Sequence, residues 1–154
     1  MPNRRATIVA ALALLGAMVA SGCGISTDPP APTPADFQGV ATELTKRAIA
    51  IDRLVSGDAG CDDPILVPTS IGLDATGIDQ AEPVRIHLYI FRNRAAFERL
   101  RASVDTCARS FVTDPQTFET IEQSPYVIAG QGPWAPDFEA AVRDALEVAA
   151  GTGN

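Results

Sequence analysis

The chain has 154 residues, with 12 basic and 19 acidic side chains and a formal net charge of −7. This length suits one folded domain. The acidic balance argues against nucleic acid as a partner, because phosphate backbones are bound by basic patches, and against electrostatic docking on an anionic lipid surface.

The first 22 residues have the three parts of a secretory signal peptide. Arg4 and Arg5 make a basic start, residues 8–20 form an uncharged apolar run, and the small residues Ser21 and Gly22 follow. As a helix, this apolar run would span roughly 20 Å, against roughly 30 Å for the hydrocarbon core of a bilayer. A permanent transmembrane helix is therefore the weaker interpretation.

The segment Val19–Cys23 resembles the lipobox of bacterial lipoproteins, with Ala20 where that family usually has Leu. The resemblance implies cleavage after residue 22 and a diacylglycerol on the sulfur of Cys23, often with a further acyl chain such as palmitate on its new amino group. Two or three chains make such an anchor effectively permanent. The resemblance also implies export to the outer face of the cytoplasmic membrane. Ordinary secretion, with Cys23 as a spare thiol, is the alternative.

The stretch after Cys23 is rich in proline and poor in apolar side chains. Such a composition predicts an extended, partly stiff spacer, so residues 23–34 are expected to form the lipidated cysteine and its tether. A single globular domain is expected over residues 35–150, followed by a frayed tail at 151–154. Removal of residues 1–22 would take away two arginines and no acids, which makes the mature chain more acidic still.

The chain has three cysteines. If Cys23 carries lipid, Cys61 and Cys107 remain, and an even remainder in an exported protein predicts one disulfide. Two free buried thiols are the alternative. A metal site is less well supported, because the two cysteines are far apart and the chain has a single histidine.

The first half of the domain is predicted to contain one helix, one short strand and a long loop. Apolar residues recur at helical spacing from Pro34 to Val55 and stop before the glycines at 57 and 60, and residues 65–67 are predicted to form a short strand. Residues 68–83 are rich in Gly, Asp, Thr and Pro, which predicts a loop, with an extra strand near Ser70–Leu73 as the alternative. The loop's acids, Asp74, Asp79 and Glu82, lack the spacing of an EF-hand, so calcium is only weakly indicated.

Residues 84–91 make the clearest predicted strand, because apolar side chains alternate with others. Val84, Ile86, Leu88 and Ile90 share the face that is expected to pack on helices. Arg85, His87, Tyr89 and Phe91 share the other face, which is expected to be either partly solvated or a concave binding surface.

The second half is predicted to contain two helices and a hairpin. Asn93 can cap a helix over residues 94–109, on whose apolar stripe Cys107 faces inward, while Glu98, Arg99, Arg101 and Asp105 form a solvated charged face. Residues 117–121 and 126–129 are predicted to be paired strands, and Pro136 begins the last helix.

This order of elements predicts an α+β domain with two layers, in which three helices collect on one face of an antiparallel sheet of about four strands, with one disulfide. The layout resembles the small secreted or lipid-anchored domains of GC-rich bacteria, particularly actinobacteria. That resemblance implies no catalytic residues.

Catalytic, metal and cofactor sites are not expected, because the chain has one histidine, no GxSxG motif and no phosphate-binding glycine loop. The leading hypothesis is a binding or interaction module that is held at the membrane by its lipid. Its partner would be a small polar ligand, a glycan or an envelope protein, bound by aromatic and cationic side chains. The alternatives are an envelope hydrolase that uses His87 and an accessory subunit of an envelope complex. The candidate surface comprises Arg85, His87, Tyr89 and Phe91, together with Tyr126 and Trp134; plain packing or surface roles are the alternative for each.

Overall fold

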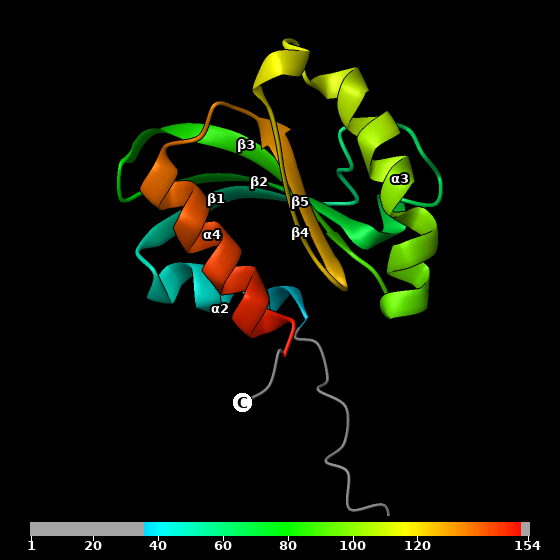
Figure 1. The fold of residues 1–154 in the computed structure, drawn as a ribbon, viewed down its shortest axis with the longest axis horizontal. Helices are drawn as coiled ribbons and strands as arrows, with labels where there is room; N and C mark the ends of the chain where they lie inside the picture. The colour runs from blue at the N-terminus through cyan, green and yellow to red at the C-terminus, as the bar shows by residue number, and fades with distance from the viewer. Residues whose placement is uncertain (1–35, 152–154) are drawn as a thin grey trace, which may run out of the picture. The chain divides into compact units, whose positions relative to one another are not determined.

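The computed structural model describes residues 36–151, which fall in one compact unit. The predicted signal peptide, Cys23 and the tether lie outside the described residues. The described part is an α+β fold with three α-helices, two short 3₁₀ turns and one sheet (Figure 1). Its elements are α2 (Phe37–Lys46), β1 (Ile49–Ser56), η1 (Val67–Thr69), β2 (Ser70–Gly77), β3 (Gln80–Ile90), α3 (Arg94–Phe111), η2 (Pro115–Thr117), β4 (Phe118–Gln123), β5 (Tyr126–Gln131) and α4 (Pro136–Ala149).

The sheet has five strands in the order β1-β2-β3-β5-β4, and every neighbouring pair is antiparallel. The predicted α+β class with three helices is confirmed. The sheet has one strand more than the four expected. The predicted hairpin, the helix capped by Asn93 and the final helix that begins at Pro136 are all present.

The extra strand is β1, which lies where the sequence predicted the second half of the first helix. That prediction is wrong because α2 ends at Lys46 and Ala48 takes a left-handed conformation (φ 59°), which no helix continues. Ile49 and Ile51 then pair with Gly77 and Ala75 of β2. β-Branched side chains favour a strand, and pairing with a neighbour overrides the weaker helical spacing.

The region between β1 and β3 also differs from expectation. Residues 65–67 form a turn that leads into η1, whereas most of the predicted loop is the buried strand β2. Ser70 and Asp74 are polar residues of a kind that favours a loop prediction, yet both are buried in the sheet. Tertiary cover from residues 57–69 and ion pairs to Asp74 make a strand possible there, and neither is visible in a local pattern.

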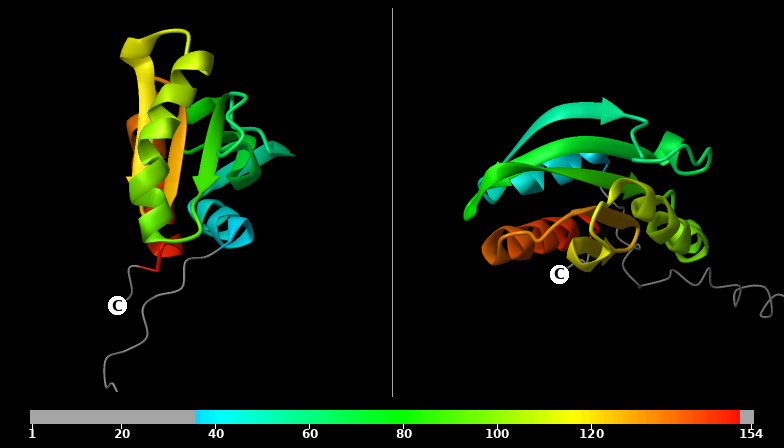
Figure 2. Two further views of the ribbon diagram at one scale, coloured as in Figure 1. Left: turned by 90° about the vertical axis from the view of Figure 1, so that its right-hand side faces the viewer. Right: turned by 90° about the horizontal axis from the view of Figure 1, so that it is seen from above.

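The helices lie on both faces of the sheet, which corrects the prediction that they collect on one. α2 and α4 cover the face that carries Ile86, Leu88 and Ile128, while α3 and residues 59–67 cover the face that carries Tyr89 and Val127. Figures 1 and 2 show α3 and α4 on opposite sides of the β4–β5 hairpin. The physical reason is that β3 and β5 are apolar on both faces, so each face has to be buried.

The turn between β2 and β3 holds the start of α4. Asp79 accepts hydrogen bonds from the backbone N–H groups of Asp137 (3.1 Å) and Phe138 (2.8 Å), because Ala135 at the N-cap has no side chain that can do so. Gln80 accepts a further bond from the N–H of Ala135 (2.9 Å). Asp79 therefore acts as a helix cap.

Candidate functional site

Three of the six residues predicted to form a binding surface (Arg85, His87 and Tyr89) share one face of β3 and a fourth, Phe91, directly follows the strand, but they are mostly buried. His87, Tyr89 and Phe91 are at most 4% exposed, and only the side chain of Arg85 reaches solvent, at 32%. α3 and the loop after β1 pack over this face. These side chains are thus part of the interior.

Tyr126 and Trp134 lie on the opposite face of the sheet. Both are buried in the cluster beneath α2 and α4, where the ring of Trp134 meets that of Phe138 edge-on at 6.1 Å. The six residues therefore do not form one exposed surface.

Arg85 is the centre of an ion-pair network on the α3 face. Its guanidinium contacts Oδ2 of Asp58 at 2.5 Å and Oδ1 of Asp74 at 3.2 Å, and it donates to the backbone oxygen of Arg53 at 2.9 Å. The guanidinium of Arg53 also pairs with Asp74. Gly72 makes room for this network, since a Cβ there would fall on the Asp58 carboxylate and the Arg85 guanidinium. The network ties the loop after β1 to three strands.

His87 is sealed within this network. Its Nε2 lies 3.3 Å from Oδ1 of Asp58, and its ring packs on that of Phe111 at 4.4 Å between centroids. Its Nδ1 is buried and has no hydrogen-bond partner among the described residues. Burial lowers the pKa of His87 and outweighs the Asp58 charge, which acts to raise it. With 4% exposure, His87 is a packed side chain.

Asp58 is held as a carboxylate. Burial acts to raise its pKa, but hydrogen bonds from Arg85 and from the backbone of Gly60 outweigh it, so the pKa lies below its ordinary value. A carboxylate beside a histidine supplies two of the three members of a catalytic triad. Within residues 36–151 no hydroxyl or thiol completes it, because Nδ1 of His87 has no partner.

The predicted disulfide between Cys61 and Cys107 is present, with the two Cα atoms 5.5 Å apart. It joins the loop after β1 to α3. Beside it, the hydroxyl of Tyr89 donates to the backbone oxygen of Ala59 at 2.7 Å, and burial raises the pKa of that hydroxyl. The disulfide and this hydrogen bond hold the cover over the α3 face of the sheet.

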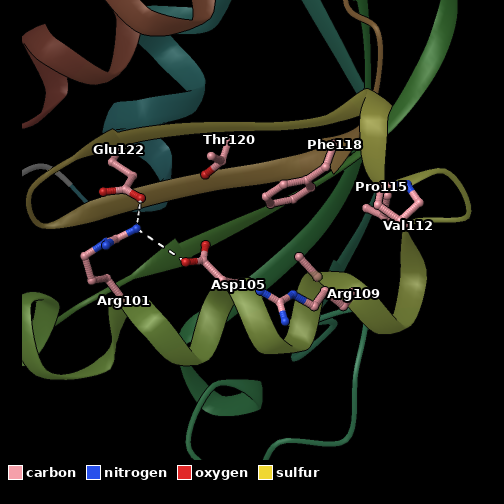
Figure 3. A pocket seen from close by; sticks show the side chains of 9 residues that line it. Arg101, Asp105, Arg109, Val112, Pro115, Phe118, Thr120 and Glu122 are labelled. Carbon is pink, nitrogen blue, oxygen red and sulfur yellow. Dashed lines mark hydrogen bonds and ion pairs between the residues drawn. The ribbon is translucent and has the colours of Figure 1, made fainter.

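The structure places a groove between α3 and the edge strand β4, with a volume of about 500 Å³. Alternate residues of β4 (Phe118, Thr120 and Glu122) face α3, and Figure 3 shows the Phe118 ring and the Thr120 hydroxyl on that side. Thr120 of β4 and Ala108 of α3 both line this space, and both have small side chains. The α3–β4 groove is lined by Arg101, Asp105, Ala108, Arg109, Val112, Pro115, Phe118, Thr120 and Glu122.

Some polar atoms in the lining of the α3–β4 groove have hydrogen-bond or ion-pair partners, and others do not. Arg101 reaches across from α3 to pair with Glu122 on β4, and it also lies 3.5 Å from Asp105 (Figure 3). Its Nε, however, is buried and has no hydrogen-bond partner within residues 36–151, and the same holds for Oγ1 of Thr120. Two buried polar atoms thus stand unpaired in the lining of one groove.

The sequence pattern does not predict this groove. It assigned Arg101 and Asp105 to a solvated helix face, and both side chains are indeed more than a third exposed. The signal available was the alternation of Phe118, Thr120 and Glu122, which marks a strand face with a small polar residue between two large ones. Which helix that face meets depends on the tertiary fold.

Residues 36–151 contain no cluster of three or more His, Cys, Asp or Glu side chains that could hold a metal ion. The three acids considered for calcium have different structural roles. Asp74 is paired with arginines, Asp79 caps α4, and Glu82 is exposed on β3.

No protein-family model, curated protein or solved structure matches the chain. In the part of the chain that the structure describes, no helix combines the length and apolar character needed to cross a bilayer.

Proposed function

We propose that this protein is a lipid-anchored binding module of the bacterial cell envelope, which receives a small molecule in the α3–β4 groove. The groove carries the proposal. Its volume of about 500 Å³ lies within the range of small-molecule sites, roughly 300–1,000 Å³, and its lining combines apolar side chains with a few polar groups, as such sites do.

The location rests on two supports. The residues before Cys23 resemble a lipoprotein signal, and the Cys61–Cys107 disulfide is of the kind that forms and persists in oxidising compartments outside the cytoplasm. The acidic chain is poorly suited to electrostatic attachment, so covalent lipid would hold it at the outer face of the membrane.

Binding is favoured over catalysis by the position of His87. A general base has to come within hydrogen-bond reach of its substrate, whereas His87 is buried between Asp58 and Phe111. The hydrolase alternative is therefore less well supported than a binding role. An accessory role in an envelope complex stays a prediction that a pull-down from membranes would address.

The test is a screen of small-molecule fragments against protein expressed from the full chain, read by amide chemical shifts. Shifts that cluster on α3 and β4 are expected. Thr120→Phe should fill the groove and abolish them, while Thr106→Phe, on the exposed side of α3, should leave them unchanged. Shifts that cluster elsewhere, or that survive Thr120→Phe in a folded variant, would contradict the proposal.

A further inference from the structure

The geometry of the α3–β4 groove points to the chemistry of its ligand. We infer that the groove binds an uncharged, largely apolar molecule that carries one oxygen acceptor, such as an alcohol, ester or ketone. This inference rests on the binding function proposed above and names the ligand class for that site.

The apolar part of the ligand follows from one end of the groove. Ala108 of α3, Val112 just after the end of α3, Pro115 of η2 and Phe118 of β4 all line the groove, and Figure 3 shows Val112, Pro115 and Phe118 at the same end of it. These side chains offer an apolar wall to an alkyl or ring system, and burial of apolar area is the main favourable term in such binding.

The absence of net charge on the ligand follows from the charges on the lining. Arg101 and Arg109 are balanced by Asp105 and Glu122. Arg101 already has two carboxylate partners, at Glu122 and at 3.5 Å on Asp105. An ionised head group would lose its hydration on entering the groove, and every opposite charge in the lining is already balanced. Binding of such a group is therefore unfavourable.

The oxygen acceptor follows from the two unpaired atoms. Nε of Arg101 can only donate a hydrogen bond, and Oγ1 of Thr120 can donate one as well. A buried donor without a partner is destabilising, and a valine at position 120 would have nearly the same shape without that cost. A ligand oxygen that accepts from these donors would satisfy them.

The experiment compares three ligands that share an eight-carbon chain: 1-octanol, octanoate and octylammonium. Each is titrated into protein expressed from the full chain, and amide shifts on α3 and β4 are followed. We expect 1-octanol to bind most tightly. Thr120→Val should lower the affinity for 1-octanol by about three- to tenfold, the equivalent of one hydrogen bond. It should also raise the Tm of the protein, because an unpaired buried hydroxyl is removed. Thr106→Val is the matched control and should change neither.

The outcomes separate the ligand class from the groove itself. If octanoate or octylammonium binds in the groove as tightly as 1-octanol, the ligand class is wrong and the binding function stands. If Thr120→Val lowers Tm and leaves the affinity for 1-octanol unchanged, the hydroxyl is structural and the inference fails. If no fragment and none of the three ligands shifts α3 and β4, both proposals fall.

Discussion

Nε2 of His87 lies 3.3 Å from Oδ1 of Asp58, and this contact joins the central strand β3 to the loop that follows β1. Arg85, two residues before His87 on the same strand face, contacts the other oxygen of the same carboxylate at 2.5 Å. One aspartate is thus held by two side chains of β3. The loop that carries it continues to Cys61, whose disulfide reaches α3. The contact therefore helps to close the α3 face of the sheet.

Acid is expected to destabilise the protein in two steps. Because burial lowers the pKa of His87 in the folded state, the unfolded chain binds a proton more readily below about pH 6.5, and stability falls as pH drops from there. The pKa of Asp58 is also lowered, so a further loss is expected below about pH 4, where the unfolded carboxyl is protonated first. Urea unfolding at a series of pH values measures both steps.

The variant His87→Gln separates these two steps. It should remove the loss between about pH 6.5 and 5 while the loss below about pH 4 remains, because Asp58 still pairs with Arg85. A wild-type free energy of unfolding that is constant from pH 7 to pH 5 would show that His87 is not destabilised by protonation.

Loss of the disulfide should destabilise the protein by roughly 2–5 kcal/mol. The Cys61–Cys107 link closes a loop with a sequence separation of 46 residues, and it restricts the unfolded chain accordingly. The double variant Cys61→Ala/Cys107→Ala is the appropriate form, because it leaves no free thiol. Urea unfolding of the variant and of the oxidised protein gives the difference. Equal stability of the two would mean that the contacts of Tyr89 and Asp58 hold the loop without the link.

Gly72→Ala should destabilise the protein by about 1–3 kcal/mol, the usual range for an overpacked interior. The added Cβ would fall on the Asp58 carboxylate and the Arg85 guanidinium, so the ion pair has to shift. A double-mutant cycle with Asp58→Ala tests this cause, since Gly72→Ala should cost less once the carboxylate is absent. An equal cost in both backgrounds would place the clash elsewhere.

The proposed lipid anchor predicts a specific mass. Protein purified from membranes should lack residues 1–22 and carry a diacylglyceryl group on Cys23, with or without a further acyl chain. Cys23→Ser should abolish the lipid and release the protein from the membrane fraction, while Cys61→Ala/Cys107→Ala should leave lipidation intact. An intact mass that corresponds to an unmodified Cys23 would contradict the anchor.

Local patterns were most informative where one face of an element is strongly apolar. The alternation over residues 84–91, the stripe that carries Cys107 and the start at Pro136 each predicted an element that is present, because side chains on a buried face repeat with the period of their own backbone. The cysteine count predicted the link between Cys61 and Cys107, since two cysteines that remain in a chain expected to be exported have few alternatives.

Local patterns failed where an element depends on its neighbours. The apolar spacing up to Val55 predicted a continuation of the first helix, but the backbone turn at Ala48 and the pairing with β2 make Ile49–Ser56 a strand. Asp74 and Gly72 favour a loop by composition, yet the strand β2 forms because arginines neutralise Asp74 and Gly72 makes room for Asp58.

By itself, the sequence determined the class of the fold, most of its helices and its one covalent link within residues 36–151, because these follow from short-range periodicity and residue chemistry. Only the tertiary structure showed that both faces of β3 are covered. It also brought Arg101 of α3 and Thr120 of β4 into the lining of one groove, although nothing in the pattern of either element relates it to the other. Such a site depends on how far apart two packed elements stand, and that distance is set by the side chains of both elements together.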